Sequence, residues 1–147
     1  MNEIKFYRSS EEYGWLSNLF LAEIEFEGRT FRSSEDAYQY GKFADADLAE
    51  AAMNLPAPRF VAILAHGLFV YDQVPDWKEI KVDRMRRVLR AKFDQHQALK
   101  DLLLATGDAN LVEASKSDAF WGSGKEGKGK NMLGTLLMEL RDQYRKG

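Results

Sequence analysis

Residues 82–104, VDRMRRVLRAKFDQHQALKDLLL, form the stretch of sequence that decides the fold. Apolar side chains recur there every three to four residues with arginine and lysine between them, which is the pattern of an amphipathic helix. The residues that share the apolar face are Met85, Val88, Leu89, Phe93, Leu99, Leu102 and Leu103. The spacing predicts one long helix from Val82 to Leu104, ended by residues 106–108.

Shorter helices are expected on both sides of this stretch. Residues 33–36 supply an N-cap and an acidic first turn, so a helix should run from about Glu35 to Phe43. A second, capped by Asp45 or Asp47, should end near Asn54, and a third should cover residues 59–66 after two prolines. A final helix should start near Asn131, and its buried face holds Leu133, Leu136, Leu137, Leu140 and Tyr144.

Strand signals occupy the first thirty residues. Residues 22–26 alternate apolar and acidic side chains, and Glu27-Gly28 offers a turn into residues 29–31, so a small antiparallel hairpin is expected. Residues 4–7 are another candidate strand, and residues 111–114 are either a short strand or a turn of helix. We therefore predict an α+β fold, a single compact and mostly helical domain over residues 1–147, with a small antiparallel β element near the N-terminus.

Composition narrows the classes of function. The chain has 147 residues, of which 45% are hydrophobic and 30% charged, as in an ordinary globular domain. It has no cysteine and two histidines, His66 and His96, so disulfides and thiolate zinc sites are excluded and neither a metal nor a cofactor is expected. The net charge of −2 provides no global field for nucleic acid. No signal peptide or membrane-spanning run is visible, so a cytoplasmic protein without a membrane partner is expected.

A glycine- and lysine-rich segment, Gly122-Ser123-Gly124-Lys125-Glu126-Gly127-Lys128-Gly129-Lys130, stands directly before the last predicted helix. Glycines let backbone N–H groups approach an anion, and the helix N-terminus and the lysines add positive charge, so the segment predicts a phosphate cradle. The spacing does not fit a Walker A loop. Trp121 just upstream suggests that a base or a sugar stacks there. The alternative is a flexible, solvated loop.

Three residues of the first predicted helix share one face. Glu35 and Lys42 are seven residues apart, close to two helical turns, and Tyr38 lies between them. Their side chains would converge on a ligand, or else form a solvated polar face beside a core tyrosine. Elsewhere, residues 15–18 would line a pocket or plug the core, and Asp118 would cap a turn. The basic run at residues 84–92 is either a solvated helix face or a contact for nucleic acid.

An ordered set of motifs covers nearly the whole chain. It comprises YGWLSN at 13–18, FRSSEDAYQYGKF at 31–43, DW at 76–77, KF at 92–93, LLATGDANLVE at 103–113, DAFWGSG at 118–124 and GKNMLGTLLM at 129–138. This set resembles the NADAR superfamily, the YbiA-like N-glycosidases. The resemblance implies a hydrolase that cleaves an N-glycosidic bond to ribose. Two substrate classes are implied: ribosylamino-pyrimidine phosphates of riboflavin synthesis, and ADP-ribose attached to guanine of a nucleic acid. In both, ribose C1′ is bonded to an exocyclic amine.

The resemblance also suggests roles for the residues singled out above. Lys42 would attack C1′ to form a Schiff base while Glu35 shuttles protons; alternatively Glu35 or Asp118 would activate water directly. The expected substrate-binding residues are Trp15, Ser17, Asn18, Tyr38, Trp121, Gly122, Gly124, Lys128, Gly129 and Asn131. The competing function is a non-catalytic binding module for ADP-ribose or nucleotides, which would not require both Glu35 and Lys42. The oligomeric state stays open.

Overall fold

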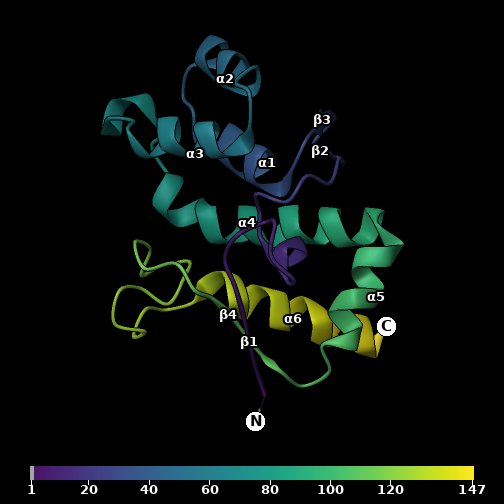
Figure 1. Ribbon diagram of the computed structural model, residues 1–147. Coiled ribbons are helices and arrows are strands. Elements are labelled where there is room, and N and C mark those ends of the chain that lie inside the picture. The colour runs from purple at the N-terminus through teal and green to yellow at the C-terminus, as the bar shows by residue number, and fades with distance from the viewer. Residues whose placement is uncertain (1) are drawn as a thin grey trace. The chain divides into compact units, whose positions relative to one another are not determined.

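A computed structural model describes residues 2–147 of the chain (Figure 1). Its α-helices are α1 (Ser34–Tyr40), α2 (Ala46–Met53), α3 (Pro58–His66), α4 (Trp77–Gln95), α5 (Gln97–Ala105) and α6 (Met132–Lys146). Its strands are β1 (Glu3–Phe6), β2 (Ile24–Phe26), β3 (Arg29–Phe31) and β4 (Asn110–Glu113), and two 3₁₀ helices are η1 (Gly14–Leu16) and η2 (Val70–Asp72). The predicted helix-rich α+β fold is therefore confirmed.

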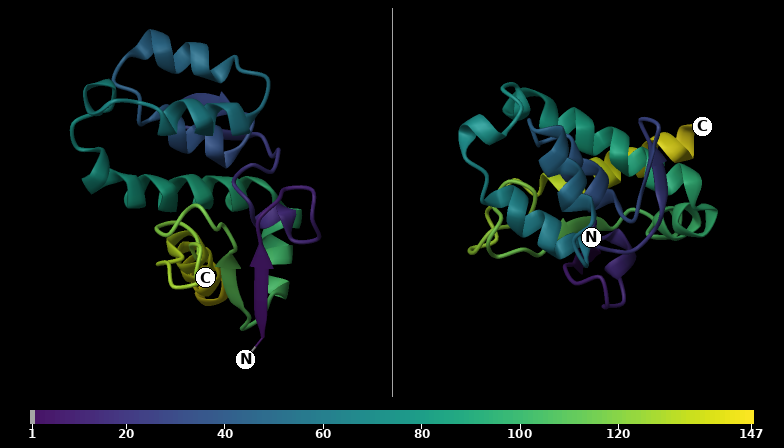
Figure 2. Two further views of the ribbon diagram at one scale, coloured as in Figure 1. Left: turned by 60° about the vertical axis from the view of Figure 1, so that its left-hand side comes forward. Right: turned by 90° about the horizontal axis from the view of Figure 1, so that it is seen from above.

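The chain divides into two units, each with its own internal contacts. Unit 1 consists of residues 2–20 together with Phe93–Gly147, and unit 2 is the continuous segment Leu21–Lys92. Figure 2 gives two further views of the elements that belong to each. The single domain expected over residues 1–147 stays a prediction. None of the helices in residues 2–147 is both long enough and apolar enough to cross a membrane.

The hairpin of unit 2 forms as its sequence predicts. β2 and β3 pair antiparallel, with Ile24 opposite Phe31 and Phe26 opposite Arg29. Both turn residues have positive φ, 50° at Glu27 and 78° at Gly28, as a tight two-residue hairpin requires. The buried faces of the strands contribute to a core that also contains Ala37 and Val88.

The helices of unit 2 begin where the sequence predicts. Ser33 caps α1, its hydroxyl accepting a hydrogen bond from the backbone N–H of Asp36, and Asp45 caps α2 in the same way. α1 ends at Tyr40 and not at Phe43, because residues 41–42 form a turn and Phe43 lies in a β-bridge. The Lys42 carbonyl accepts from the Val74 N–H, and Phe43 forms an isolated antiparallel bridge with Gln73. This pairing fixes the backbone that carries Lys42.

Unit 1 contains a strand pairing that the sequence analysis did not predict. β1 and β4 run parallel, from Glu3 opposite Asn110 to Phe6 opposite Glu113 (Figure 2). Helix α6 contacts β4 so closely that a Cβ atom on Gly134 would overlap the Leu111 carbonyl oxygen. The predicted leucines of α6 are buried, and Tyr144 is half-buried with its hydroxyl donating to Asp94 at 2.6 Å.

The single long helix expected from Val82 to Leu104 is wrong. The chain forms α4 and α5 instead, because His96 adopts an extended conformation (φ −130°, ψ 92°) and interrupts the helix. Because of this interruption, residues after His96 no longer lie on the face that one continuous helix would give them. Leu99 and Leu103 remain buried, whereas Leu102, predicted on the same face, is 44% exposed.

Candidate functional site

Glu35 and Lys42 lie near one another in unit 2, as the helical spacing predicts. Glu35 is in the first turn of α1, and Lys42 follows its last turn. Both side chains are half-buried. The Glu35 carboxylate is close enough to Lys42 for its charge to raise the pKa of the Lys42 amine. A carboxylate and an amine are thus available at one place.

The Lys42 amine has a lowered pKa. Burial is the main cause, the charge of Lys81 adds to it, and the Glu35 carboxylate opposes both. Nζ donates a hydrogen bond of 2.8 Å to the carbonyl oxygen of Ala65, in the last turn of α3. A lowered pKa increases the fraction of neutral amine, which is the form that acts as a nucleophile.

The Glu35 carboxylate is oriented by its own helix. Oε1 accepts a 2.9 Å hydrogen bond from Nε2 of Gln39, one turn further along α1. Gln39 is itself buried, so this contact restrains the rotamer of Glu35. A half-buried carboxylate held in this way is suited to carrying a proton between a ligand and water.

Two aromatic rings pack beside these residues. Tyr38 is 5% exposed, and its ring lies 5.1 Å from that of Trp77 at an interplanar angle of 50°. Trp77 is the first residue of α4, and Lys81 lies one turn further along the same face. The site prediction did not include Trp77 or Lys81. The signal that would have found them is the i, i+4 spacing that begins at the Asp76-Trp77 motif.

In unit 1, Asp118 caps a turn. Its Oδ1 accepts hydrogen bonds from the backbone N–H groups of Phe120 (3.0 Å) and Trp121 (2.8 Å). This is the structural role that the sequence offered as the alternative. Trp121 is half-buried, and its ring packs edge-on against Phe120 with centroids 4.9 Å apart. The turn at Asp118 therefore fixes the backbone position of Trp121.

The backbone of the glycine-rich segment is already hydrogen-bonded to the protein. Five N–H groups of the segment and the three that follow it donate to protein carbonyls: those of Ser123, Gly124, Gly127, Gly129 and Lys130, and then those of Asn131, Met132 and Leu133. The last three precede or begin α6, and their acceptors are the carbonyls of Gly122, Phe120 and Trp121. These eight groups are not available to an anion, so a cradle built from them is not what the glycines provide. Attraction of a phosphate would come mainly from the lysine side chains.

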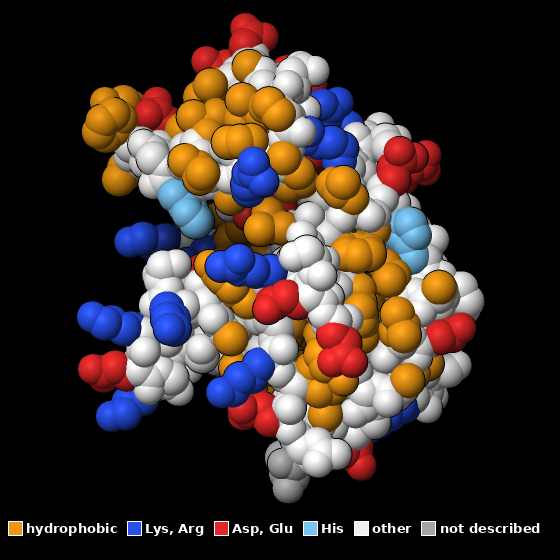
Figure 3. Space-filling view, in the orientation of Figure 1, with side chains coloured by type: hydrophobic (Ala, Val, Ile, Leu, Met, Phe, Trp, Pro, Cys, Tyr) orange, Lys and Arg blue, Asp and Glu red, His pale blue; other side chains and the backbone are white. Residues whose placement is uncertain are grey.

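Close backbone packing, and not anion binding, explains why glycine occupies these positions. A Cβ atom on Gly129 would come within 2.5 Å of the Gly122 carbonyl oxygen, and one on Gly122 within 2.9 Å of the Glu113 carbonyl oxygen. Gly124 adopts a φ of 73°, which a side chain would strain. The segment therefore needs glycine to pack on itself. Lys125, Lys128 and Lys130 are exposed, and basic side chains project over this part of the molecule at the left of Figure 3.

Asn131 is held by strand β4. Its Oδ1 accepts from the Glu113 N–H at 2.9 Å, and its Nδ2 donates to the Leu111 carbonyl at 2.8 Å. The residue adopts a left-handed conformation (φ 49°, ψ 46°) as the N-cap position of α6. Its amide therefore ties the start of α6 to β4, and this contact accounts for both of its polar atoms.

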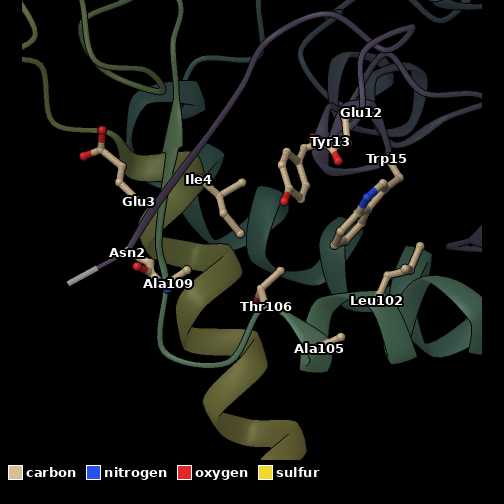
Figure 4. Close-up of a pocket in the computed structure, with 10 residues that line it drawn as sticks. All are labelled: Asn2, Glu3, Ile4, Glu12, Tyr13, Trp15, Leu102, Ala105, Thr106 and Ala109. Carbon is tan, nitrogen blue, oxygen red and sulfur yellow. The ribbon is translucent and has the colours of Figure 1, made fainter.

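Three further predicted residues lie in or near η1. Ser17 and Asn18 are 4% and 6% exposed, and the Ser17 hydroxyl accepts from the Leu19 N–H at 3.1 Å. Trp15 is half-buried, packs edge-on against Phe93 at 6.3 Å, and lines a pocket of unit 1 (Figure 4). The predicted site residues thus divide into Glu35, Tyr38 and Lys42 in unit 2 and the remainder in unit 1. Among residues 2–147, no group of three or more acidic or histidine side chains is placed to hold a metal ion.

Comparisons with known proteins agree over nearly the whole chain. A family model described as the NADAR domain matches residues 5–145. N-glycosidase YbiA of Escherichia coli is 43% identical over 140 residues, which cover 95% of this chain and 87% of that protein. The riboflavin biosynthesis protein VVA0006 of Vibrio vulnificus is 39% identical over 95% of this chain, which spans 38% of that longer protein. The NMR structure of Escherichia coli YbiA superposes with a TM-score of 0.86 at 41% identity, covering 98% of this chain and 85% of that one.

Proposed function

Because the chain belongs to the NADAR domain family and is a hydrolase that acts on N-glycosyl bonds, we propose that its substrate is a phosphorylated ribosylamine. In such a compound, ribose C1′ is bonded to an exocyclic amine and the 5′ side carries phosphate. The observation that carries the proposal is the half-buried Lys42 amine, with its lowered pKa, beside the Glu35 carboxylate. The name of the Vibrio vulnificus relative favours a ribosylamino-pyrimidine phosphate over ADP-ribose on guanine.

The proposed chemistry passes through an imine at C1′. A ribosylamine opens when its ring oxygen takes a proton and C1′ becomes an imine. The neutral Lys42 amine adds to C1′, and the C1′–N bond to the original amine breaks as that nitrogen takes a proton through Glu35. Water then adds to the lysine imine, which releases the sugar and restores Lys42. The Ala65 carbonyl accepts one N–H of Lys42, so the nitrogen lone pair is directed away from α3.

A direct assay tests the substrate class. The whole protein is incubated with a ribosylamino-pyrimidine phosphate and, separately, with an oligonucleotide that carries ADP-ribose on guanine, and the released amine is measured by mass spectrometry. We expect release from the pyrimidine compound. Release from the oligonucleotide alone would assign the second substrate class. Binding of ADP-ribose without any release would instead identify a non-catalytic binding module.

Glu35→Gln tests the proton shuttle. The amide keeps the shape and the contact with Gln39 but cannot carry a proton, so turnover should fall by about 10²–10⁴-fold with substrate affinity retained. The matched control is Glu50→Gln on α2, which removes an exposed carboxylate of the same unit that bonds the Tyr40 hydroxyl. Equal activity in both variants would exclude Glu35 as the proton carrier.

Lys42→Arg tests the covalent route. Guanidinium keeps the positive charge but stays protonated, so it cannot form an imine. We expect almost no turnover in this variant and full turnover in Lys78→Arg, an exposed lysine of the same unit. Borohydride added during turnover of the unmodified protein should reduce the imine and leave a ribosyl adduct on Lys42. An active Lys42→Arg protein without an adduct would leave direct attack by water, assisted by Glu35.

A further inference from the structure

A pocket of about 640 Å³ opens on unit 1, between the start of β1, the turn before η1 and the second half of α5 (Figure 4). Its volume lies within the range of small-molecule sites. Two aromatic side chains, Tyr13 and Trp15, line it, and their rings point toward Leu102 on α5 and Thr106, which follows that helix. Neither Asp118, Trp121 nor the glycine-rich segment lines this pocket, so it is separate from the candidate residues of that region.

The aromatic wall is held in place and partly exposed. The Trp15 ring packs edge-on against Phe93, which is fully buried, with an interplanar angle of 76°. Both Tyr13 and Trp15 remain half-buried, and Leu102 is 44% exposed. When a ligand covers apolar surface that was in contact with water, the free energy of the system falls. The pocket therefore presents a pre-formed surface for a flat, apolar group.

The charge of the lining is negative. Of the residues that line the pocket none is lysine, arginine or histidine, and its two charged side chains are Glu3 and Glu12. Lys5 partly neutralises Glu3 at an N···O distance of 3.7 Å, which leaves Glu12 as the main charge. The Thr106 hydroxyl donates to the Leu103 carbonyl and accepts from Arg141, so it has little capacity left for a ligand. The side chains that line the pocket therefore favour a cationic ligand over a phosphate group.

We propose that this pocket binds a flat aromatic ring with a positively charged amine, its ring against Trp15 and Tyr13 and its charge toward Glu12. Aromatic faces attract cations as well as stack on rings, and the carboxylate adds to that attraction. Such a ligand is chemically different from the anionic substrate proposed above. The proposal therefore gives Trp15, which the sequence analysis expected to bind the substrate, a different ligand.

Two probes with the same ring and opposite charge test the proposal. Tryptamine and indole-3-acetate are titrated into the whole protein at low salt, and binding is followed by calorimetry and by the NMR signal of the Trp15 indole N–H. Tryptamine should bind several-fold more tightly than indole-3-acetate, and added salt should reduce the difference. Equal affinities at low salt, or no change at Trp15 at the highest soluble concentration, would overturn the proposal.

Three variants locate the binding. Trp15→Ala should weaken the binding of tryptamine by roughly tenfold or more, since the stacking of a nucleobase on one aromatic side chain contributes about that much to affinity. Glu12→Gln keeps the shape and should remove the preference for tryptamine while leaving neutral indole unaffected. Leu102→Arg alters an exposed residue, so folding should be retained even if Trp15→Ala unfolds, and the preference should reverse toward indole-3-acetate. Unchanged affinities in Glu12→Gln and Leu102→Arg would place the probes elsewhere and exclude the pocket.

Discussion

At the scale of single residues, the state of the Lys42 amine depends on Lys81. Both are lysines of unit 2, and the charge of Lys81 lowers the pKa of Lys42. Lys81→Gln removes that charge, so the pKa of Lys42 should rise and less of the amine should be neutral at pH 7. If the neutral amine reacts, the rising limb of the pH dependence of kcat/KM should move to higher pH. Lys78→Gln is the matched control, and a limb that stays in place in Lys81→Gln would contradict a neutral Lys42 nucleophile.

A second lysine, Lys92, should affect the stability of the folded protein. Lys92 is fully buried, and burial lowers its pKa to about 7 from 10.5. Between these two values the unfolded chain binds more protons than the folded one, so this residue makes stability rise with pH from about 7 to 10.5. At lower pH the folded protein holds a buried charge.

Lys92→Met should therefore be more stable than the unmodified protein at pH 7, and the difference should shrink as pH rises. The slope of that difference is at most about 1.4 kcal/mol per pH unit, because only one proton is involved. Urea unfolding of both proteins between neutral and alkaline pH measures this difference in stability. All other titrating groups are present in both proteins, so their contributions cancel in the difference. Two parallel stability curves would show that Lys92 does not titrate in this range.

Sequence reasoning anticipated which residues lie close together along one helix better than contacts between distant segments. Helical spacing predicted that Glu35 and Lys42 lie near one another, and they do, although Lys42 follows the end of α1; their catalytic roles stay predictions. Asn131 was predicted to bind a ligand, yet its amide bonds Leu111 and Glu113, about twenty residues earlier in the chain. Such a contact follows from which strand lies beside α6, and no local pattern encodes that.

At the scale of elements, Arg84 of α4 caps the C-terminal end of α1. It is 7% exposed, and its guanidinium donates to the carbonyls of Ala37 (2.6 Å from Nη2) and Tyr38 (3.1 Å from Nε) and to Glu27 of the hairpin turn at 2.8 Å. Carbonyls in the last turn of a helix lack partners within it. Gly41 leaves room for this side chain, since a Cβ atom there would overlap the guanidinium.

Arg84→Gln should destabilise the protein by about 1–3 kcal/mol, because buried carbonyls lose their donors. The control is Arg87→Gln one turn on. Its exposed guanidinium also bonds Glu27 (3.3 Å), and like that of Arg84 it lies over the Phe26 ring. That variant should change stability by less than about 1 kcal/mol. Urea unfolding compares the two, and equal losses would assign the effect to Glu27 and not to α1.

The starts of α1 and α2 were predictable, whereas α4 begins at Trp77 and not at the expected Val82, and two other features of the elements were not predicted. Ser33 and Asp45 mark the starts of α1 and α2 because a cap is a local hydrogen bond. The break at His96 has no proline or glycine to announce it, and the apolar period continues on both sides. The pairing of β1 with β4 joins distant segments, so a pattern within either strand does not reveal it.

At the scale of the whole molecule, the candidate residues come from two units whose sequences are interleaved. The order of motifs along the chain was enough to suggest the family. It did not reveal that Glu35 and Lys42 belong to one unit while Trp121 and the lysine-bearing loop belong to the other. Assignment to a unit depends on contacts between segments far apart in the chain, which motif order does not contain.

Anion binding should be detectable as a change in the stability of the whole molecule. A ligand that binds only the folded state raises stability by about 2.7 kcal/mol at a hundredfold excess over its Kd. Since five backbone N–H groups of the glycine-rich segment and the three that follow it are engaged, the double variant Lys128→Ala/Lys130→Ala should lose most of the rise in Tm produced by phosphate. Lys100→Ala, on α5, is the control. An unchanged rise in Tm would mean that phosphate binds away from this segment.

The division of the chain has a consequence for its synthesis on the ribosome. Unit 2 is continuous and can fold as soon as it has emerged, but β1 pairs with β4, which is made on the order of 100 residues later. At about 5–20 residues per second, the first strand therefore waits for several seconds or longer without its partner. During that interval, the unpaired backbone of β1 is open to capture by a chaperone or by another strand.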